Sequence, residues 1–436
     1  MDNLILNIET VAFGGSGIAR LDGKVYFVPD AVPGDRVEVR ITEEKKKYCT
    51  AEIISFIEKS PLRNQSPCPY SSECGGCQWI EIDYNKQLEW KKSFVTSSLS
   101  RIGKLPELDK DLEILPSNCQ FNYRNKILLR ARIIKEDNCN KLVVGFFKKS
   151  TREFIRIKIC KISDISINLF LERIDSLNFS EDLLGLEFKI EVQALYQSKN
   201  EGTPLVIVTI YPATQDKLEI YEPIKKEISN LEIVVRCSLI MEEKKRFLLE
   251  KDTVKNKELS FYTAQSQFQQ VNIDLNKRLR KIIFDKVPQN AKRVLDLFCG
   301  SGNLSLALEN DYVEGIEISP LAIETAKYNV EKNGLKNRIY LAGSSEAHLW
   351  KCTKNQERFD IVIADPPREG MYKEVIPLSI LEPDTIIYVS CSPPTLARDI
   401  ATLSKRGYQI TDIMCLDFFP NTFHVETVVT LSMIEK

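Results

Sequence analysis

A cysteine near the end of the sequence, Cys391, has the surroundings of a reactive thiol. It follows the apolar run Ile386–Val389 and precedes Ser392 and two prolines. We therefore expect it at the carboxyl end of a buried strand. Open α/β sheets bind their ligands at that edge, and a thiolate there could attack an electrophilic carbon. A cysteine in an apolar run is also a good small core residue, so the rest of the sequence must distinguish the two interpretations.

An acidic residue further along the chain, Glu426, could supply the base that such a thiol needs. Glu426 opens an otherwise apolar strand, where a buried carboxylate needs either a chemical use or a partner. His424, one of two histidines, lies beside it and is interpreted as a structural cap as readily as a catalytic group. A thiol and a carboxylate together suit covalent addition followed by removal of a proton.

The segment Val294–Ser305 has the pattern of a strand, a glycine-rich turn and a helix. It lacks the third glycine of the dinucleotide fingerprint, which argues against a nicotinamide cofactor. A nicotinamide site and a tight turn that binds no ligand are nevertheless the two alternative interpretations of the glycines. Glu317 ends the next expected strand, twenty-one residues after Asp296, and could accept hydrogen bonds from a ribose diol. These features favour S-adenosylmethionine as the ligand.

In that site, Gly300 and Gly302 would let the backbone approach the amino-acid end of the cofactor. Asp296 would hold the ammonium group of the cofactor, through water or through the turn. We expect Phe298 and Asn303 to line the same pocket.

The motif Asp365-Pro366-Pro367 follows the fourth expected strand, at the usual substrate position of such sheets. Amino-methylases of adenine and cytosine carry an aromatic residue next, where this chain has Arg368. RNA cytosine-5 methylases carry a cysteine in this motif and a second, nucleophilic cysteine later. This chain has only the later one, Cys391, and the acid Glu426 in addition. The pattern therefore favours uracil over cytosine as the target base.

A separate group of thiols lies in the glycine-containing loop Ser66–Trp79, which holds Cys68, Cys74 and Cys77. Their spacing is typical of ligands to a metal, and a fourth ligand must come from elsewhere. Cys160 is the first candidate, and the competitors are Cys119, Cys139 and Cys49. Zinc and an iron–sulfur cluster both accept four thiolates. Zinc ribbons usually pair two close knuckles, and this loop has one, so a 4Fe–4S cluster fits better.

Three domains are expected to position these groups. Residues 1–58 alternate polar and apolar residues between glycine turns, which predicts a small OB-like β-barrel. Residues 59–260 are expected to form a central α+β domain that carries the iron–sulfur loop and binds RNA. Residues 261–436 alternate strands with helices, which predicts a doubly wound α/β domain with a parallel sheet.

After the cysteine loop, the central domain should have a helix over residues 81–102, with Lys86, Lys91 and Lys92 in solvent. Its basic strands are interleaved with aromatic residues, as in Phe121–Lys126 and around Arg130 and Arg132, a mixture that suits contacts with RNA loops. The expected strands of this domain are Lys126–Ile134, Leu142–Phe147, Phe154–Ile159, Leu186–Leu195 and Pro204–Tyr211.

Composition sets wider limits. The 436 residues are 43% hydrophobic and 28% charged, with a net charge of −1, so any site for a polyanion must come from local clustering. No apolar run is long enough to cross a membrane, and the N-terminus has no signal-peptide pattern. We therefore expect a cytoplasmic protein, in which the twelve cysteines do not form disulfides.

The combined motifs of the C-terminal half resemble the RNA 5-methyluridine methyltransferase family. They are Asp296–Asn303, Asp365–Gly370, Ser390–Asp399 and Phe419–Glu426. Residues Phe268–Asn272 resemble the first cofactor-contact motif of that family, and the patterns Gly17–Arg20, Val32–Asp35 and Lys46–Tyr48 resemble a TRAM domain, an RNA-binding barrel. The barrel and the cysteine loop together resemble the 23S rRNA branch, which carries a 4Fe–4S cluster, whereas the bacterial tRNA branch lacks both.

The resemblance implies a class I, Rossmann-like S-adenosylmethionine methyltransferase domain, with Cys391 as nucleophile and Glu426 as base. It places the following residues at the cofactor or the target uracil: Gln270, Phe298, Asn303, Glu317, Ser344 and Asp365. It assigns the cluster to Cys68, Cys74, Cys77 and Cys160. The family often has asparagine where this chain has Ser392, and asparagine or aspartate is common around Ser344.

The expected activity is therefore S-adenosylmethionine-dependent methylation of C5 of a uridine in 23S rRNA by a monomer that binds no membrane. The same chemistry on tRNA is the alternative. A non-catalytic iron–sulfur protein that binds RNA would leave Cys391 and Glu426 without a purpose.

Overall fold

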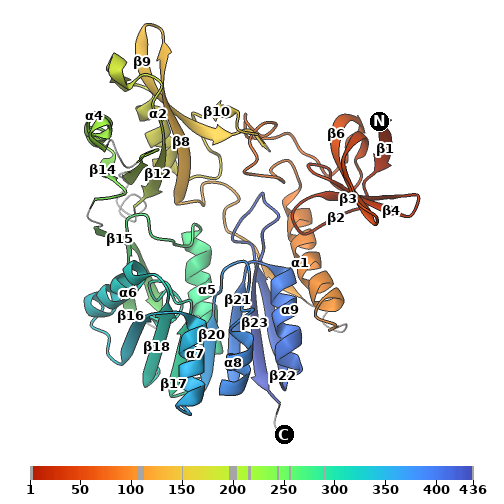
Figure 1. Cartoon of the computed structure of the whole chain (residues 1–436), viewed down its shortest axis with the longest axis vertical. Helices are drawn as coiled ribbons and strands as arrows, with labels where there is room; N and C mark the ends of the chain where they lie inside the picture. Colours follow the sequence, from red (N-terminus) through yellow and green to blue (C-terminus); the bar gives the residue numbers. More distant parts are fainter. Residues whose placement is uncertain are drawn as a thin grey trace. The chain divides into compact units, whose positions relative to one another are not determined.

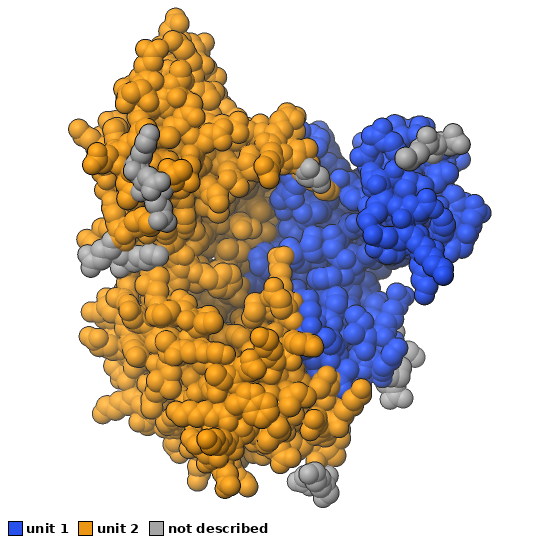
Figure 2. Space-filling model, in the orientation of Figure 1, with its two compact units in different colours: residues 1–117, 391–401, 414–427 blue, residues 118–390, 402–413, 428–436 orange. Residues whose placement is uncertain are grey.

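The computed structural model describes residues 3–105, 112–149, 151–195, 204–214, 218–242, 245–254, 257–288 and 290–434. Figure 2 shows two compact units in different colours. Residues 1–117, 391–401 and 414–427 form the first unit, and residues 118–390, 402–413 and 428–436 form the second. The three domains expected from the sequence are continuous segments of the chain, and their boundaries stay a prediction.

The first unit begins with a six-stranded sheet in the order β1-β5-β6-β4-β3-β2. Its strands are β1 Leu4–Asn7, β2 Thr10–Val11, β3 Gly17–Leu21, β4 Lys24–Val28, β5 Arg36–Glu44 and β6 Tyr48–Glu58. Alternation in β5 buries Val37 and Val39 and exposes Arg36 and Arg40, as expected for a strand with one face on a core. Cys49 lies in that core.

A long helix, α1 (Tyr84–Arg101), follows in the first unit, and β7 (Glu113–Leu115) comes after it. The side chain of Asp83 caps α1 by accepting a hydrogen bond from the backbone N–H of Lys86. The helix is confirmed, but the expectation that its lysines lie in solvent is wrong for Lys91. That side chain is fully buried, because it has an acidic partner far along the chain.

The second unit contains a seven-stranded sheet in the order β10-β9-β8-β12-β13-β14, with β11 also paired to β9. The strands are β8 Lys126–Glu136, β9 Cys139–Phe147, β10 Phe154–Arg156, β11 Asn178–Phe179, β12 Glu187–Ala194, β13 Val206–Tyr211 and β14 Val234–Leu239. The helices of this region are α2 Ile165–Ile174 and α4 Glu222–Ser229, with short 3-10 turns at Glu181–Leu183 and Leu218–Tyr221. All five expected strands are present, although β10 ends earlier than predicted because the chain turns towards Cys160.

A hairpin of β15 (Arg246–Val254) and β16 (Lys257–Ala264) comes next, followed by α5 (Ile273–Lys286). Arg280 on α5 is buried between Glu250 and Asp252 of the hairpin, with Nη1 2.9 Å from Glu250 and Nη2 2.8 Å from Asp252. These pairs fix the helix against the hairpin.

Strands of the C-terminal half form, together with β7, an eight-stranded sheet in the order β19-β18-β17-β20-β21-β23-β22-β7. The first five of these strands are parallel, which confirms the predicted doubly wound domain. The elements are β17 Arg293–Leu297, β18 Tyr312–Glu317, α6 Pro320–Lys332, β19 Arg338–Ala342, α7 Ser345–Lys354, β20 Ile361–Ala364, α8 Val375–Leu381, β21 Thr385–Ser390, α9 Pro393–Ser404, β22 Tyr408–Leu416 and β23 Glu426–Met433. Helix α6 packs on β18 and β19, and α7 packs on α8 (Figure 1).

Candidate active site

The glycine-rich turn that follows β17 adopts a backbone that few residues tolerate. Phe298, Gly300 and Gly302 have φ angles of 60°, 55° and 83°, a left-handed region that suits glycine. A Cβ atom on Gly302 would lie 2.8 Å from the hydroxyl of Tyr340, whereas one on Gly300 would meet nothing within 4 Å. Gly302 is therefore required by packing, and Gly300 faces open space in which a ligand can approach the backbone.

The carboxylate of Glu317 is tied to this turn. Glu317 ends β18, and its Oε2 accepts a hydrogen bond of 3.3 Å from the backbone N–H of Gly300. Its Oε1 accepts one of 2.9 Å from the backbone N–H of Ser319. Each carboxylate oxygen can accept a second hydrogen bond, so the fixed group can still receive ribose hydroxyls.

Two further carboxyl groups lie at the carboxyl ends of β17 and β20. Asp296 is buried within β17, and Asp365 follows β20, with its backbone N–H 3.4 Å from the carbonyl oxygen of Leu297. Burial, together with the negative charges of Asp365 and Glu317 and against a hydrogen bond from Ser305, raises the pKa of Asp296 to about 7. Burial likewise raises the pKa of Asp365 to about 7. Three acidic groups near one turn favour a positively charged ligand, which would stabilise their ionised forms.

Asn303 is held by helix α5. Its Oδ1 accepts hydrogen bonds of 2.9 Å from Asn276 and 3.0 Å from Arg280, and its Nδ2 donates one of 2.9 Å back to Asn276. These contacts fix residues 301–307, which form successive turns in place of the helix expected there from the sequence. A role for Asn303 at the cofactor stays a prediction.

Gln270 and Ser344 occupy different settings. Gln270 is half-buried in the irregular segment between β16 and α5, two residues after the exposed Phe268. Ser344 is the N-cap of α7 and accepts a hydrogen bond of 3.4 Å from the backbone N–H of Ala347. Its observed role is thus to cap a helix, and contact of either residue with a cofactor stays a prediction.

One candidate residue was missed at the sequence level. Ile318 directly follows Glu317 and is 76% exposed, so it offers apolar surface beside the carboxylate expected to bind ribose. The sequence feature that could have indicated it is a large apolar residue directly after the acid that ends a strand. Packing in the core does not explain an exposed apolar side chain at that position.

Cys391 and Glu426 are placed by strands of the same eight-stranded sheet. Cys391 is the first residue after β21 and is half-exposed, and α9 begins two residues later. The amino end of a helix stabilises negative charge close to it. Glu426 is the first residue of β23 and is 3% exposed. Both residues therefore lie at strand ends, as the sequence predicts.

Within the first unit, helix α1 holds the segment that leads to Glu426. Lys91 pairs with Asp417 inside the protein, and the hydroxyl of Tyr84 donates a hydrogen bond of 2.7 Å to the same carboxylate. Gln87 Oε1 accepts a hydrogen bond of 2.8 Å from the backbone N–H of Asn421. These contacts leave the segment little freedom.

His424 lies among aromatic rings of that segment. Its ring centroid is 4.1 Å from that of Phe423 and 5.7 Å from that of Phe419. The backbone N–H of His424 donates to the hydroxyl of Thr422 at 3.3 Å. This setting is consistent with the structural interpretation of His424.

Comparison with known proteins identifies the chain. The profile of the family described as tRNA (Uracil-5-)-methyltransferase matches residues 83–434. The chain belongs to this family. The profile of the TRAM domain matches residues 6–54, which confirms the interpretation of the N-terminal sheet. As a family member, the chain is an RNA uracil-5 methyltransferase that uses S-adenosylmethionine.

Relatives of this uracil-5 methyltransferase align over nearly its whole length. An uncharacterized RNA methyltransferase of Aquifex aeolicus is 32% identical over 99% of this chain and 98% of its own. One of Protochlamydia amoebophila is 33% identical over 98% of this chain and 97% of its own. A solved structure, the Pyrococcus abyssi tRNA (uracil-54, C5)-methyltransferase in complex with S-adenosyl-L-homocysteine, has a TM-score of 0.67 at 24% identity. It covers 98% of this chain and 100% of its own, which confirms the fold.

The cysteine loop of the methyltransferase is built from successive turns. The backbone N–H of Ser71 donates to the carbonyl of Cys68 at 3.3 Å, and that of Cys74 donates to the carbonyl of Tyr70 at 2.7 Å. Cys68, Cys74, Cys77 and Cys160 are all half-buried. Among the described residues, no group of three or more His, Cys, Asp or Glu side chains is arranged to hold a metal ion. The cluster therefore stays a prediction.

No helix in the described ranges of the methyltransferase is both long and apolar enough to span a membrane.

Proposed function

We propose that this chain methylates C5 of a specific uridine in 23S rRNA through a covalent adduct between Cys391 and C6 of uracil. The thiolate of Cys391 forms an Sγ–C6 bond, and the electron pair of the C5–C6 double bond moves to O4 as an enolate. C5 then attacks the sulfonium methyl group, whose bond to sulfur breaks. The carboxylate of Glu426 removes the C5 proton, the C5–C6 double bond forms again, and the Sγ–C6 bond breaks.

The position of Cys391 carries this proposal. Residue Ala364 of β20 pairs with Tyr388 of β21 in a parallel register, and Asp365 and Cys391 follow these two strands. Parallel strands bring their following residues to one edge of the sheet, where such folds bind ligands. A thiol there, with the acid Glu426 and no second cysteine after Asp365, supports uracil chemistry. The target uridine must be extruded from its stack to expose C6.

The cofactor would lie at the turn after β17. Gly300 would allow its amino-acid end to approach, Asp296 and Asp365 would face its positive charges, and Glu317 would accept the ribose hydroxyls. Ile318 would pack against the adenine ring, with Gln270, Phe298, Asn303 and Ser344 as further contacts. When bound, S-adenosylmethionine supplies an electrophilic methyl group.

The choice of rRNA rests on the combination of a TRAM domain with the cysteine loop. A tRNA target is the second candidate, because the solved Pyrococcus abyssi structure is that of a tRNA (uracil-54, C5)-methyltransferase and covers 98% of this chain. That coverage extends into the barrel, so the barrel alone does not separate the two substrates.

Mapping of 5-methyluridine decides between these substrates. In a strain lacking this gene, we expect 5-methyluridine to disappear from one or two positions of 23S rRNA and to stay at full level in tRNA. The purified protein should restore the modification on rRNA from the deletion strain. Loss from tRNA instead would replace the rRNA proposal with the second candidate.

We further propose that Cys68, Cys74, Cys77 and Cys160 bind a 4Fe–4S cluster. The support is the donor set, since three thiols lie within ten residues in a loop of tight turns. Protein purified without oxygen should be brown and contain about four irons per chain. Cys77→Ser should lose the colour, whereas the exposed Cys139 can be replaced by serine without effect. Stoichiometric zinc with no visible absorbance would contradict the cluster.

We propose that the protein acts in the cytoplasm as a monomer. Light scattering of the purified protein tests the oligomeric state.

A further inference from the structure

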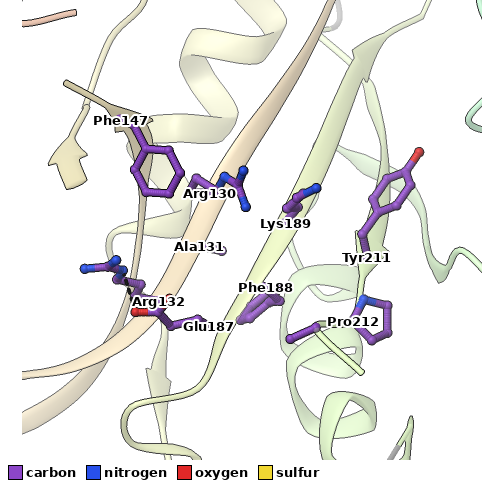
Figure 3. A pocket seen from close by; sticks show the side chains of 10 residues that line it. Arg130, Ala131, Arg132, Phe147, Glu187, Phe188, Lys189, Tyr211 and Pro212 are labelled. Carbon is purple, nitrogen blue, oxygen red and sulfur yellow. Dashed lines mark ion pairs between the residues drawn. The ribbon is translucent and has the colours of Figure 1, made fainter. Parts of the chain in front are cut away.

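A cavity in the second unit lies outside the candidate active site. It opens on the seven-stranded sheet and has a volume of about 390 Å³, within the range of ligand pockets. Figure 3 shows that Phe147, Arg130, Lys189 and Tyr211 follow one another across its floor. These residues come from the neighbouring strands β9, β8, β12 and β13. Lys189 and Tyr211 are far from Arg130 in sequence, so only the fold places them in one row.

Two cations lie directly opposite each other on this floor. Arg130 and Lys189 are partners in the antiparallel pairing of β8 with β12. Like charges in directly opposed positions of a sheet destabilise it. Neither side chain forms an ion pair with any residue in the described parts of the chain. An anionic ligand would relieve the repulsion between them.

The neighbouring cations of the same sheet are neutralised. Arg132, the next cation along β8, pairs with Glu187 at 2.9 Å, and Lys126 pairs with Glu191 at 3.1 Å. The missing counter-charge is therefore specific to Arg130 and Lys189 and is not a general feature of this face.

Aromatic rings flank the two cations on both sides. The guanidinium of Arg130 lies over the ring of Phe147, 4.6 Å from its centroid, which holds the cation in place. Tyr211 is the partner of Lys189 in the pairing of β12 with β13, and its hydroxyl donates to Glu191 at 3.4 Å. Burial raises the pKa of Tyr211 to about 12, so the phenol stays neutral and does not repel an anion.

We propose that this cavity binds one nucleotide of an unpaired RNA segment, with its phosphate between Arg130 and Lys189 and its base against Tyr211. Basic groups beside an aromatic platform are the usual means of binding single-stranded nucleic acid. The site would hold a part of the substrate away from the uridine that reacts. This inference needs one part of the proposed function, namely that the substrate is RNA. It does not depend on which RNA is methylated or on the roles of Cys391 and Glu426.

The test uses the full-length protein and a fluorescein-labelled, single-stranded RNA of mixed sequence, with affinity measured by anisotropy at several salt concentrations. The double variant R130A/K189A should bind at least tenfold more weakly. Its plot of log affinity against log salt should be flatter by about 0.7, because the loss of one phosphate contact with a single strand changes the slope by about 0.7. Tyr211→Ala should weaken binding by about tenfold, whereas Tyr211→Phe keeps the ring and should bind normally.

Lys135→Ala is the matched control. Lys135 lies on the same strand, is exposed and pairs with Glu181 at 3.7 Å, and it does not line the cavity. Its loss should change affinity less than twofold. Circular dichroism should show every variant folded as the wild type.

Unchanged affinity and salt dependence in R130A/K189A would overturn the proposal and leave the cavity to another ligand, such as an acidic protein segment. An equal loss in Lys135→Ala would also overturn it, since charge alone would then explain binding. The result is independent of the catalytic mechanism, because binding is measured without methylation. Normal binding by the cavity variants leaves the role of Cys391 intact, and an active Cys391→Ala protein leaves the cavity intact.

Discussion

Lys91 and Asp417, 326 residues apart in sequence, form an ion pair from which solvent is fully excluded. Burial lowers the pKa of Lys91, and the charge of Asp417 opposes that shift. The ammonium of Lys91 also donates to the carbonyl of Phe419 at 3.0 Å. An N-terminal helix thus fixes the start of the segment that ends at Glu426, so its packing bears on the position of the proposed base.

Lys91→Met should destabilise the first unit strongly. The substitution leaves the carboxylate of Asp417 buried without its counter-charge, which costs about 3–5 kcal/mol. Urea unfolding followed by tryptophan fluorescence suits the measurement, since Trp79 and Trp90 lie in one core of this unit.

The double variant K91M/D417L should lose less stability than Lys91→Met. Lys86→Met, which breaks an exposed pair with Glu89, should cost less than about 0.5 kcal/mol. Equal losses for Lys91 and Lys86 would show that the buried pair has no special weight.

Cys391→Ala should abolish methylation while RNA binding persists, because only the covalent step is removed. Glu426→Gln should instead accumulate a protein–RNA adduct, since the adduct forms but the C5 proton is not removed. Denaturing gels of reactions with labelled RNA reveal such an adduct. Turnover by Cys391→Ala at the wild-type rate is incompatible with the mechanism.

Affinity for S-adenosylmethionine should rise with pH through the neutral range. Asp296 and Asp365 have pKa values raised to about 7, so they are largely protonated at pH 6 and ionised at pH 8. A cationic ligand favours the ionised groups, and binding therefore releases protons below pH 7. Calorimetry in buffers of different ionisation enthalpy measures this release.

Asp296→Asn should reduce the proton release and should stabilise the ligand-free protein at pH 8. Folding raises the pKa of this carboxyl group above its unfolded value of 3.8. At any pH above 3.8 the group therefore lowers the free energy of unfolding, and the uncharged amide of asparagine does not. Cofactor affinity that is constant from pH 6 to pH 8 in the wild type would contradict this account.

Gly302→Ala and Gly300→Ala should separate packing from ligand approach. Both replace a glycine of positive φ, which costs about 1 kcal/mol. Only the Gly302 variant also brings Cβ to 2.8 Å from Tyr340, so it should lose more stability. Gly300→Ala should stay folded yet bind cofactor more weakly, because its Cβ fills the open space at the turn. Thermal unfolding and calorimetry report the two effects, and identical behaviour of both variants would argue against a ligand at Gly300.

The sequence by itself determined the elements and the chemistry at their ends. Apolar runs that stop at Gly300 or Pro393 indicate strands of a doubly wound sheet, because local sterics and burial act within a few residues. Asp296, Glu317, Asp365 and Cys391 lie at or near the ends of such runs, so their places at strand ends could be predicted without a structure.

Only the tertiary structure decided which distant groups meet. The burial of Lys91 depends on Asp417, and the row of Arg130, Lys189 and Tyr211 depends on the pairing of three strands. Ser344 caps a helix and Asn303 binds α5, contacts that the motifs alone did not indicate. Long-range pairing follows from the energy of the whole fold and leaves no periodic mark in the local sequence. A lysine on a helix therefore looks solvent-exposed until its partner is known.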